Sequence, residues 1–196
     1  MYKVYGSVPT RTLRILWMLE ELGQPYELIN ANPQSDTILA INPTGKVPVL
    51  QDGDGYITDS VAGMMHLADK HDQLTFPVAS IERAQMNAMV MWLVDNLDAV
   101  LWAAARHSFA LPKERRVPEV KDSLRWEFSR NLEKLEKQMS GPFLIGDKMT
   151  IADILCTQCL GWAKSAKFPI ESQVLQDYSK SMRGRDAYKR AIANNS

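Results

Sequence analysis

The chain has 196 residues, of which 45% are hydrophobic and 23% are charged, as is typical of a soluble globular protein. That length fits one large domain or two small ones, and either can bury a core without disulfides or a structural metal. Its 23 lysines and arginines equal its 23 aspartates and glutamates. A balanced charge excludes a strongly basic surface, so we expect neither nucleic acid nor a membrane as a partner.

A strand, a helix and a second strand are predicted at the start of the chain. The stretch "YKVYG" is typical of a strand that ends at Gly6, and residues 10–22 carry apolar side chains at helical spacing. Gly23 and Pro25 are helix stop signals, and "PYELI" is a second strand. A strand–helix–strand unit of this length predicts two parallel strands joined by a right-handed crossover.

A hairpin and two more helical segments follow. Turn residues predominate up to Gly45, with one helical turn expected over residues 37–40. The stretches "KVPVLQ" and "YITD" are the third and fourth strands, because "DGDG" between them is a strong hairpin signal. Asp59 or Ser60 then caps a helix that reaches His71. We therefore expect a mixed four-stranded sheet with about three helices.

Helical patterns alone continue after this point. Thr150 with Asp153 three residues later resembles a capping box, in which the aspartate replaces the usual glutamate or glutamine. The boundary between an α/β part and an all-helical part lies near residues 75–80. We predict a first domain over residues 1–75 and a helical domain over 81–196. Its helices are expected at residues 81–105, 119–139, from Thr150 onward and at 173–182, with a helical tail from Asp186.

Two cysteines, Cys156 and Cys159, form a C-x-x-C pair about five residues inside a predicted helix. A reactive pair is expected at a helix N-terminus, so we interpret these as buried structural thiols. The histidines lack ligand spacing, and we expect no metal site. The sequence starts without the pattern of a signal peptide, and the apolar run at residues 88–94 is too short to span a bilayer. We expect a cytoplasmic protein with reduced thiols.

Three segments carry groups suited to binding a peptide-like ligand. A cis Val47–Pro48 bond would expose the backbone of Val47 to an extended peptide, and the alternative is an ordinary trans proline at a strand edge. Asp59 and Ser60 precede a helix, where they either hold an amino-acid head group or only cap the helix.

Ser7 and Thr10 lie at another helix start. Neither residue resembles a hydrolase nucleophile, because no G-x-S-x-G motif is present. A hydroxyl at this position can still donate a hydrogen bond to a thiolate, and capping is the alternative role.

These segments, in this order, resemble the glutathione S-transferase family over nearly the whole chain. "GSVPTRTLRILWMLEELGQPYE" is similar to the first βαβ unit of its thioredoxin-like domain, "NPTGKVPVL" to its cis-proline loop and "TDS" to its acidic–Ser pair. "FLIGDKMTIADI" is similar to the capping-box helix of its all-α domain, and "MRGRDAYKRA" to its C-terminal stretch. The resemblance implies a thioredoxin-like domain followed by a helical domain, and a cytosolic homodimer.

The resemblance also implies how glutathione is held. The Val47 backbone would pair with the cysteinyl part beside cis Pro48, Asp59 and Ser60 would hold the γ-glutamyl end, and Lys46 would reach a carboxylate. Members of this family use a Tyr, Ser or Cys near the end of the first strand against the glutathione sulfur. Tyr5 is placed too early and no cysteine is available, which leaves Thr10 as the first choice and Ser7 as the second.

The resemblance implies an enzyme that transfers glutathione to a small hydrophobic electrophile, as in detoxification. Glutathione would be a co-substrate, and no further cofactor is expected. Trp102 and Arg106 are expected to line the electrophile pocket. Two alternatives stay open. One is a non-catalytic glutathione-binding or protein-interaction module of the same fold, and the other is a glutathione-dependent peroxidase or isomerase.

Overall fold

The computed structural model describes residues 1–194 and divides them into two compact units. The first unit contains Met1–Phe76 together with the described residues from Met182 on, and the second contains Pro77–Ser181. The sequence grouped all of 81–196 in one helical domain, which stays a prediction, whereas the compact units divide near Met182. The helix after Arg185 belongs with the first unit.

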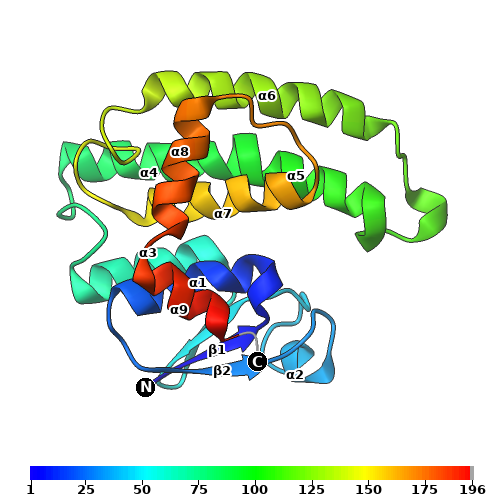
Figure 1. Cartoon of the computed structure of the whole chain (residues 1–196). Helices are drawn as coiled ribbons and strands as arrows, with labels where there is room; N and C mark the ends of the chain where they lie inside the picture. The colour runs from blue at the N-terminus through cyan, green and yellow to red at the C-terminus, as the bar shows by residue number, and fades with distance from the viewer. Residues whose placement is uncertain (195–196) are drawn as a thin grey trace. The chain divides into compact units, whose positions relative to one another are not determined.

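The first unit is built on a four-stranded mixed sheet in the order β2-β1-β3-β4 (Figure 1). β1 pairs in parallel with β2, which confirms the predicted parallel pair, and β3 is antiparallel to both β1 and β4. The strands are β1 (Tyr2–Gly6), β2 (Tyr26–Asn30), β3 (Val49–Asp52) and β4 (Gly55–Ile57). β3 starts after Pro48 rather than at Lys46, because proline donates no hydrogen bond to a ladder.

Alternate side chains of the strands point to opposite faces of the sheet. Tyr5 and Val49 pack with Ile38 of the short helix α2 (Asp36–Leu39). The intervening residues Val4 and Leu50 are also fully or almost fully buried. The α2 segment agrees with the helical turn predicted at residues 37–40.

Three helices of the first unit, α1 (Leu13–Glu21), α3 (Ser60–His71) and α9 (Asp186–Ala193), lie on one side of this sheet in Figure 1. Gly63 allows α3 to approach α1 closely, because an added Cβ would lie 2.7 Å from Cδ1 of Ile15. α9 packs on α1, where the ring of Tyr188 meets the ring of Trp17 edge to face at 4.9 Å between centroids.

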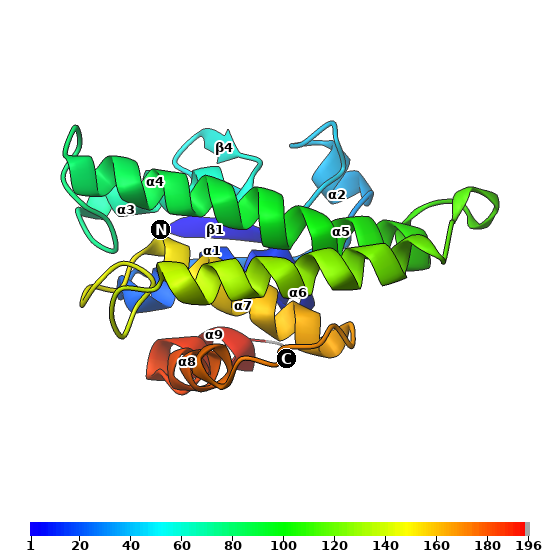
Figure 2. The same cartoon turned by 90° about the horizontal axis from the view of Figure 1, so that it is seen from above.

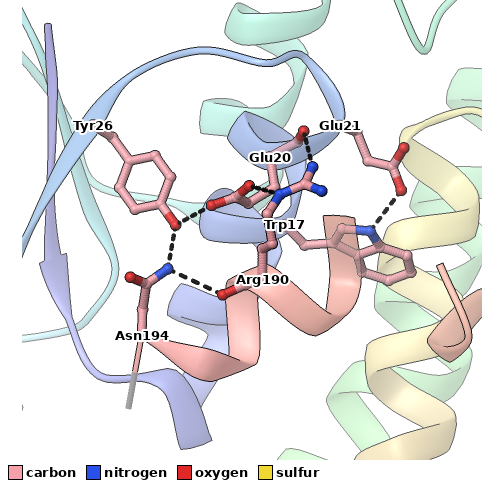
Figure 3. Close-up of polar contacts among 6 residues, drawn as sticks. All are labelled: Trp17, Glu20, Glu21, Tyr26, Arg190 and Asn194. Carbon is pink, nitrogen blue, oxygen red and sulfur yellow. Dashed lines mark hydrogen bonds and ion pairs between the residues drawn. The ribbon is translucent and has the colours of Figure 1, made fainter. Parts of the chain in front are cut away.

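Ion pairs and hydrogen bonds join α9 to the end of α1 (Figure 3). Arg190 Nε donates to Glu20 Oε2 at 2.6 Å, and Tyr26 donates to the other oxygen of Glu20 at 2.8 Å. Asn194 in turn donates to the Tyr26 hydroxyl at 2.6 Å. Burial and the neighbouring Glu20 raise the pKa of the Tyr26 phenol, so it stays protonated as a donor.

Glu21 carries a second set of contacts to the C-terminal segment. Arg185 binds both of its carboxylate oxygens, at 2.6 and 2.7 Å, and Trp17 Nε1 donates to the same group at 2.8 Å. These contacts explain why the end of the chain belongs to the first unit.

The second unit is all-helical, with no strand among its described residues. Figure 2 shows α6 running beside α4 and α5, and α5 also contacts α7. The capping box predicted at Thr150 and Asp153 is confirmed, with Thr150 N donating to Asp153 Oδ2 at 2.8 Å. The helices are α4 (Ile81–Leu93), α5 (Ala99–Ala105), α6 (Val120–Gln138), α7 (Ile151–Ser165) and most of α8 (Gln173–Arg183).

The helical stretch Ile81–Ala110 passes continuously through α4 and α5 by way of irregular turns. By length and composition alone it could cross a membrane, with a mean hydropathy of 1.4 over its most apolar window. Half of that window is buried inside the protein, as in the core helix of a soluble domain. The stretch is therefore only weak evidence that the chain spans a membrane.

Candidate glutathione site

The loop between β1 and α1 holds the two hydroxyls that the sequence singled out. α1 begins at Leu13 rather than at Thr10, because Thr10 has an extended backbone with φ −113° and ψ −173°. Gly6 permits this loop for two reasons. Its φ of +142° is rare for other residues, and an added Cβ would collide with the hydroxyl of buried Thr12.

The Thr10 hydroxyl is fully engaged inside the loop. It donates to the Ser7 carbonyl oxygen at 2.7 Å, and it accepts from the backbone N–H of Thr12 at 3.1 Å. The Thr12 hydroxyl lies 2.8 Å away. Because the only proton of Thr10 points at a carbonyl, which can only accept, Thr12 must donate in this last contact. Thr10 therefore fixes the backbone of Ser7 and has no proton left for a ligand.

The Ser7 hydroxyl, unlike the Thr10 hydroxyl, is not used in a hydrogen bond within the loop. Its side chain is half-buried, caps no helix, and makes no hydrogen bond within residues 1–194. Tyr5, by contrast, is buried in β1 and donates to Gln51 at 2.8 Å. This agrees with the sequence, in which Tyr5 lies too early to contact the sulfur. Of the residues considered for the sulfur, Ser7 has the hydroxyl that is available.

The second part of the site is the loop before β3. The Val47–Pro48 peptide bond is cis, as predicted. Within the described chain, neither the N–H nor the C=O of Val47 has a hydrogen-bond partner. Buried Asn42 holds the loop, because its amide donates to the Lys46 carbonyl at 2.9 Å and its oxygen accepts from the Thr44 hydroxyl at 2.9 Å. The sequence reasoning missed Asn42, which looked like one turn residue among several.

The third part is the N-terminus of α3. Asp59 caps this helix, with Oδ1 accepting from the N–H groups of Val61 at 2.8 Å and Ala62 at 3.0 Å. The Oδ2 of this exposed residue has no hydrogen-bond partner within residues 1–194. Capping and ligand binding are therefore compatible in Asp59.

Ser60 and Arg14 form a buried pair at the same place. Arg14 is only 1% exposed, and its Nη1 donates to Ser60 Oγ at 3.1 Å. Since Ser60 accepts from a cation, its own proton remains to be donated. The sequence reasoning missed Arg14, although a cation inside the apolar stripe of a helix was a signal for it.

The strand register brings these three parts to one end of the sheet. Tyr5 is opposite Val49 in the antiparallel β1–β3 pair, so two residues further Ser7 leaves the sheet where Val47 enters it. Leu50 is opposite Ile57 in the β3–β4 pair, so β4 delivers Asp59 and Ser60 to the same end. The edge of the first unit thus presents a free hydroxyl, a free peptide group and a polar helix start.

Of the remaining predicted residues, one borders this cluster and two belong to the second unit. Lys46 is exposed, next to Val47, and its ammonium makes no ion pair in the described part of the chain. Trp102 and Arg106 belong to the second unit, in α5 and in the turn that follows it. Their role toward an electrophile stays a prediction.

Cys156 and Cys159 are free and buried in α7. Burial, together with the neighbouring Cys159 and Asp153, raises the pKa of the Cys156 thiol, which keeps it protonated. A buried, protonated thiol is a poor nucleophile. The structural interpretation of the C-x-x-C pair agrees with this geometry.

A thioredoxin-like unit with a free peptide group at one edge, followed by an all-helical unit, defines the class of protein. Residues 1–75 match the family description "Glutathione S-transferase, N-terminal domain", and residues 97–183 match "Glutathione S-transferase, C-terminal domain". A glutathione S-transferase from Zea mays is 30% identical over 168 residues, which cover 78% of this chain and 76% of that protein. The chain belongs to the glutathione S-transferase family.

Further relatives agree with this assignment. A zeta-class glutathione S-transferase from Euphorbia esula is 29% identical over 79% of this chain and 71% of its own. The crystal structure of a glutathione transferase from Methylococcus capsulatus superposes with a TM-score of 0.88, at 24% identity, over 100% of this chain and 98% of that one. A family member from Pseudomonas fluorescens, with two glutathione bound, superposes with a TM-score of 0.80 at 22% identity over 97% and 92% of the two chains.

Proposed function

We propose that the protein is a glutathione transferase in which Ser7 stabilises the glutathione thiolate. The observation that carries this proposal is the contrast between the two hydroxyls, because Thr10 is engaged in the loop and Ser7 is free. Glutathione is supported as the ligand by the family and by the Pseudomonas fluorescens relative that binds it. The order of preference between Thr10 and Ser7 is thus the reverse of the one drawn from the sequence.

Each residue of the tripeptide is assigned to groups of the first unit. The free N–H and C=O of Val47 pair with the cysteinyl residue of glutathione, as an added strand would. The γ-glutamyl carboxylate accepts from Ser60 and lies near the guanidinium of Arg14, while its ammonium pairs with Asp59. Lys46, next to Val47, would bind the glycine carboxylate.

The energy required of Ser7 is modest. A free thiol has a pKa of about 8.5, and lowering it by about two units takes about 2.7 kcal/mol. One hydrogen bond to a charged group contributes about 1.5–3 kcal/mol, which is sufficient by itself. In the reaction the thiol proton goes to solvent, and the thiolate forms a C–S bond as the leaving group departs with its electron pair.

The same proposal covers the cofactor, the electrophile, the oligomeric state and the location of the protein. Glutathione is a co-substrate and no further cofactor is invoked. The electrophile is small and hydrophobic, and Trp102 and Arg106 contribute to its pocket. We also propose a cytoplasmic homodimer with a role in detoxification, for which sedimentation velocity is the direct test of the oligomeric state.

Two measurements on matched variants test the proposal. Calorimetry measures glutathione binding, and a chlorodinitrobenzene assay measures turnover, for the wild type, Ser7→Ala, Thr10→Val and Ser7→Thr. Ser7→Ala is expected to lower kcat/KM by about 10- to 100-fold, the value of a charge-assisted hydrogen bond, with little change in affinity. Ser7→Thr keeps a hydroxyl and is expected to retain more activity than Ser7→Ala.

Two other results would lead to different conclusions. Glutathione binding without turnover in the wild type would favour a non-catalytic binding module. If Ser7→Ala turned over like the wild type while Thr10→Val did not, the assignment of the hydroxyl would be wrong.

A further inference from the structure

The segment between α5 and α6, residues 107–118, concentrates positive charge in a chain whose charges balance overall. It contains Lys113, Arg115 and Arg116 but only one carboxylate, that of Glu114. We call this segment the basic loop. The balance over the whole chain predicted no membrane partner, but such a balance does not exclude a local basic patch.

Two cations of the basic loop lack the carboxylate partners that cations of the neighbouring helix have. On α6, Arg125 pairs with Asp122 at 2.9 Å. In contrast, the exposed side chains of Lys113 and Arg115 make no hydrogen bond or ion pair within residues 1–194. Their charges are therefore available to an anionic partner outside the chain.

Arg116 holds the backbone of the basic loop in place. Its guanidinium donates to three carbonyl oxygens of the loop, those of Leu111 at 2.8 Å, Phe109 at 2.9 Å and Ser108 at 3.2 Å. The backbone N–H of Val117 donates to His107 Nδ1 at 3.0 Å, which joins the two ends of the loop. Because these contacts order the loop before a partner arrives, binding costs less conformational entropy.

Two apolar side chains of the same loop are exposed to solvent. The exposed fraction is 67% for Phe109 and 51% for Val117. Figures 1 and 2 both show the loop extending past the end of α6. A protruding loop that combines apolar side chains with cations matches a lipid surface, which offers apolar depth beneath charged headgroups.

We propose that the basic loop binds the surface of an anionic lipid membrane. Phe109 and Val117 would enter the boundary between headgroups and acyl chains, and Lys113 and Arg115 would lie near the anionic headgroups. An acidic protein would complement the charge equally well, but it would need a cavity shaped to receive the protruding apolar side chains. The surface is independent of glutathione, since the basic loop contains none of the residues assigned above to glutathione or its electrophile.

Co-sedimentation of the whole protein with vesicles tests this surface. Vesicles of phosphatidylcholine with about 30% phosphatidylserine are compared with vesicles of phosphatidylcholine alone, at about 0.1 M salt. The wild type is expected to bind the anionic vesicles at least about tenfold more tightly. Raising the salt to about 0.5 M should remove most of this difference, because the attraction is electrostatic.

A charge-reversal pair tests the cations. Lys113→Glu with Arg115→Glu is expected to weaken binding to anionic vesicles by at least about 25-fold, or about fivefold for each cation removed. Lys137→Glu with Lys180→Glu makes the same change in net charge at exposed lysines elsewhere in the second unit. This matched control is expected to stay within about fivefold of the wild type, because its charges lie outside the loop.

A second pair of variants tests the apolar contact. Phe109→Ser is expected to weaken binding by about tenfold, because an aromatic side chain no longer leaves water. Trp126 of α6 is 66% exposed, which is nearly the same as Phe109. Trp126→Ser is therefore the matched control for an exposed aromatic side chain, and it should bind vesicles like the wild type.

The variants are first compared with the wild type by circular dichroism, so that only folded proteins are tested. Weaker binding in both loop variants, with binding kept in both controls, supports the proposal. Equal sedimentation with the two kinds of vesicle, binding unchanged in the loop variants, or an equal loss in the controls would overturn it. Binding to soluble polyglutamate without binding to vesicles would also overturn it, in favour of an acidic protein as the partner.

Discussion

At the scale of single residues, hydrogen-bonding capacity distinguishes side chains that the sequence makes look equivalent. Ser7 and Thr10 are both hydroxyls at a helix start, yet Thr10 uses its proton on the Ser7 carbonyl. Arg14 and Ser60 are 46 residues apart in sequence and share a buried hydrogen bond. In both cases one residue positions another, and the second keeps a hydroxyl proton that no described residue accepts.

The two oxygens of Asp59 provide a test at this scale. Asp59→Asn keeps an oxygen for the cap, since asparagine caps helices as well as aspartate, but it loses the charge that would pair with an ammonium. Glutathione is expected to bind about tenfold more weakly to Asp59→Asn, with little change in Tm. Asp59→Ala should weaken binding and lower Tm as well, because it also removes the cap at a cost of about 1 kcal/mol.

Calorimetry and thermal unfolding of the two variants give this comparison. Equal glutathione affinity in Asp59→Asn and the wild type would show that Asp59 only caps α3.

At the scale of elements, β3 and α3 are linked by a charged cluster on Asp52. Lys70 Nζ lies 2.6 Å from Asp52 Oδ2, and His66 Nε2 lies 2.7 Å from the same atom. These hydrogen bonds, to Lys70 first and His66 second, lower the pKa of the Asp52 carboxyl below its usual value.

A lowered folded-state pKa determines how stability depends on pH. The unfolded chain binds the proton first as pH falls below about 4, so stability is lost between the unfolded and the folded pKa. Denaturant titrations are expected to show a smaller decrease in the free energy of unfolding from pH 5 to pH 3 for Asp52→Asn than for the wild type. Parallel decreases in the two proteins would contradict this role, and exposed Asp54 gives the control Asp54→Asn.

Most elements of the fold could be predicted from periodicity and turn signals, and the exceptions have local physical causes. The strand-like stretch "YKVYG" predicted β1, and the cap at Asp59 or Ser60 predicted the start of α3. The turn residues "DGDG" predicted the hairpin. The start of α1 did not, because the Thr10 side chain bonds to the backbone and competes with helix formation. The late start of β3 reflects Pro48.

The site was predictable only in part. The cis Val47–Pro48 bond and the cap at Asp59 followed from motifs, since each depends on neighbours in sequence. The choice between Ser7 and Thr10 depends on which proton is already used, which no spacing reveals. Arg14 could have been found as a buried cation in an apolar stripe.

At the scale of the whole molecule, the chain returns to its first unit at its end. The contacts of Arg185 and Arg190 with Glu21 and Glu20 span 164 and 170 residues of sequence. No local pattern could predict them, which is why the sequence groups the last helix with the helical domain.

The Arg185–Glu21 pair is expected to be the stronger part of this connection. Glu21 is 8% exposed at its side chain, so removing its partner leaves a largely buried charge. Arg185→Ala is expected to lower the free energy of unfolding by about 2 kcal/mol, allowing for the partial exposure of the arginine. Lys189→Ala, which removes an exposed pair with Asp186, should change it by less than about 0.5 kcal/mol. Equal effects in denaturant titrations would show that the pair contributes no more than a surface contact.

The pKa of the thiol in bound glutathione tests the central claim most directly. It is measured by the ultraviolet absorbance of the thiolate as a function of pH, in the wild type, Ser7→Ala and Thr10→Val. We expect a pKa well below 8.5 in the wild type and a return toward that value in Ser7→Ala, with a smaller change in Thr10→Val. A bound thiol whose pKa is the same in Ser7→Ala as in the wild type would contradict it.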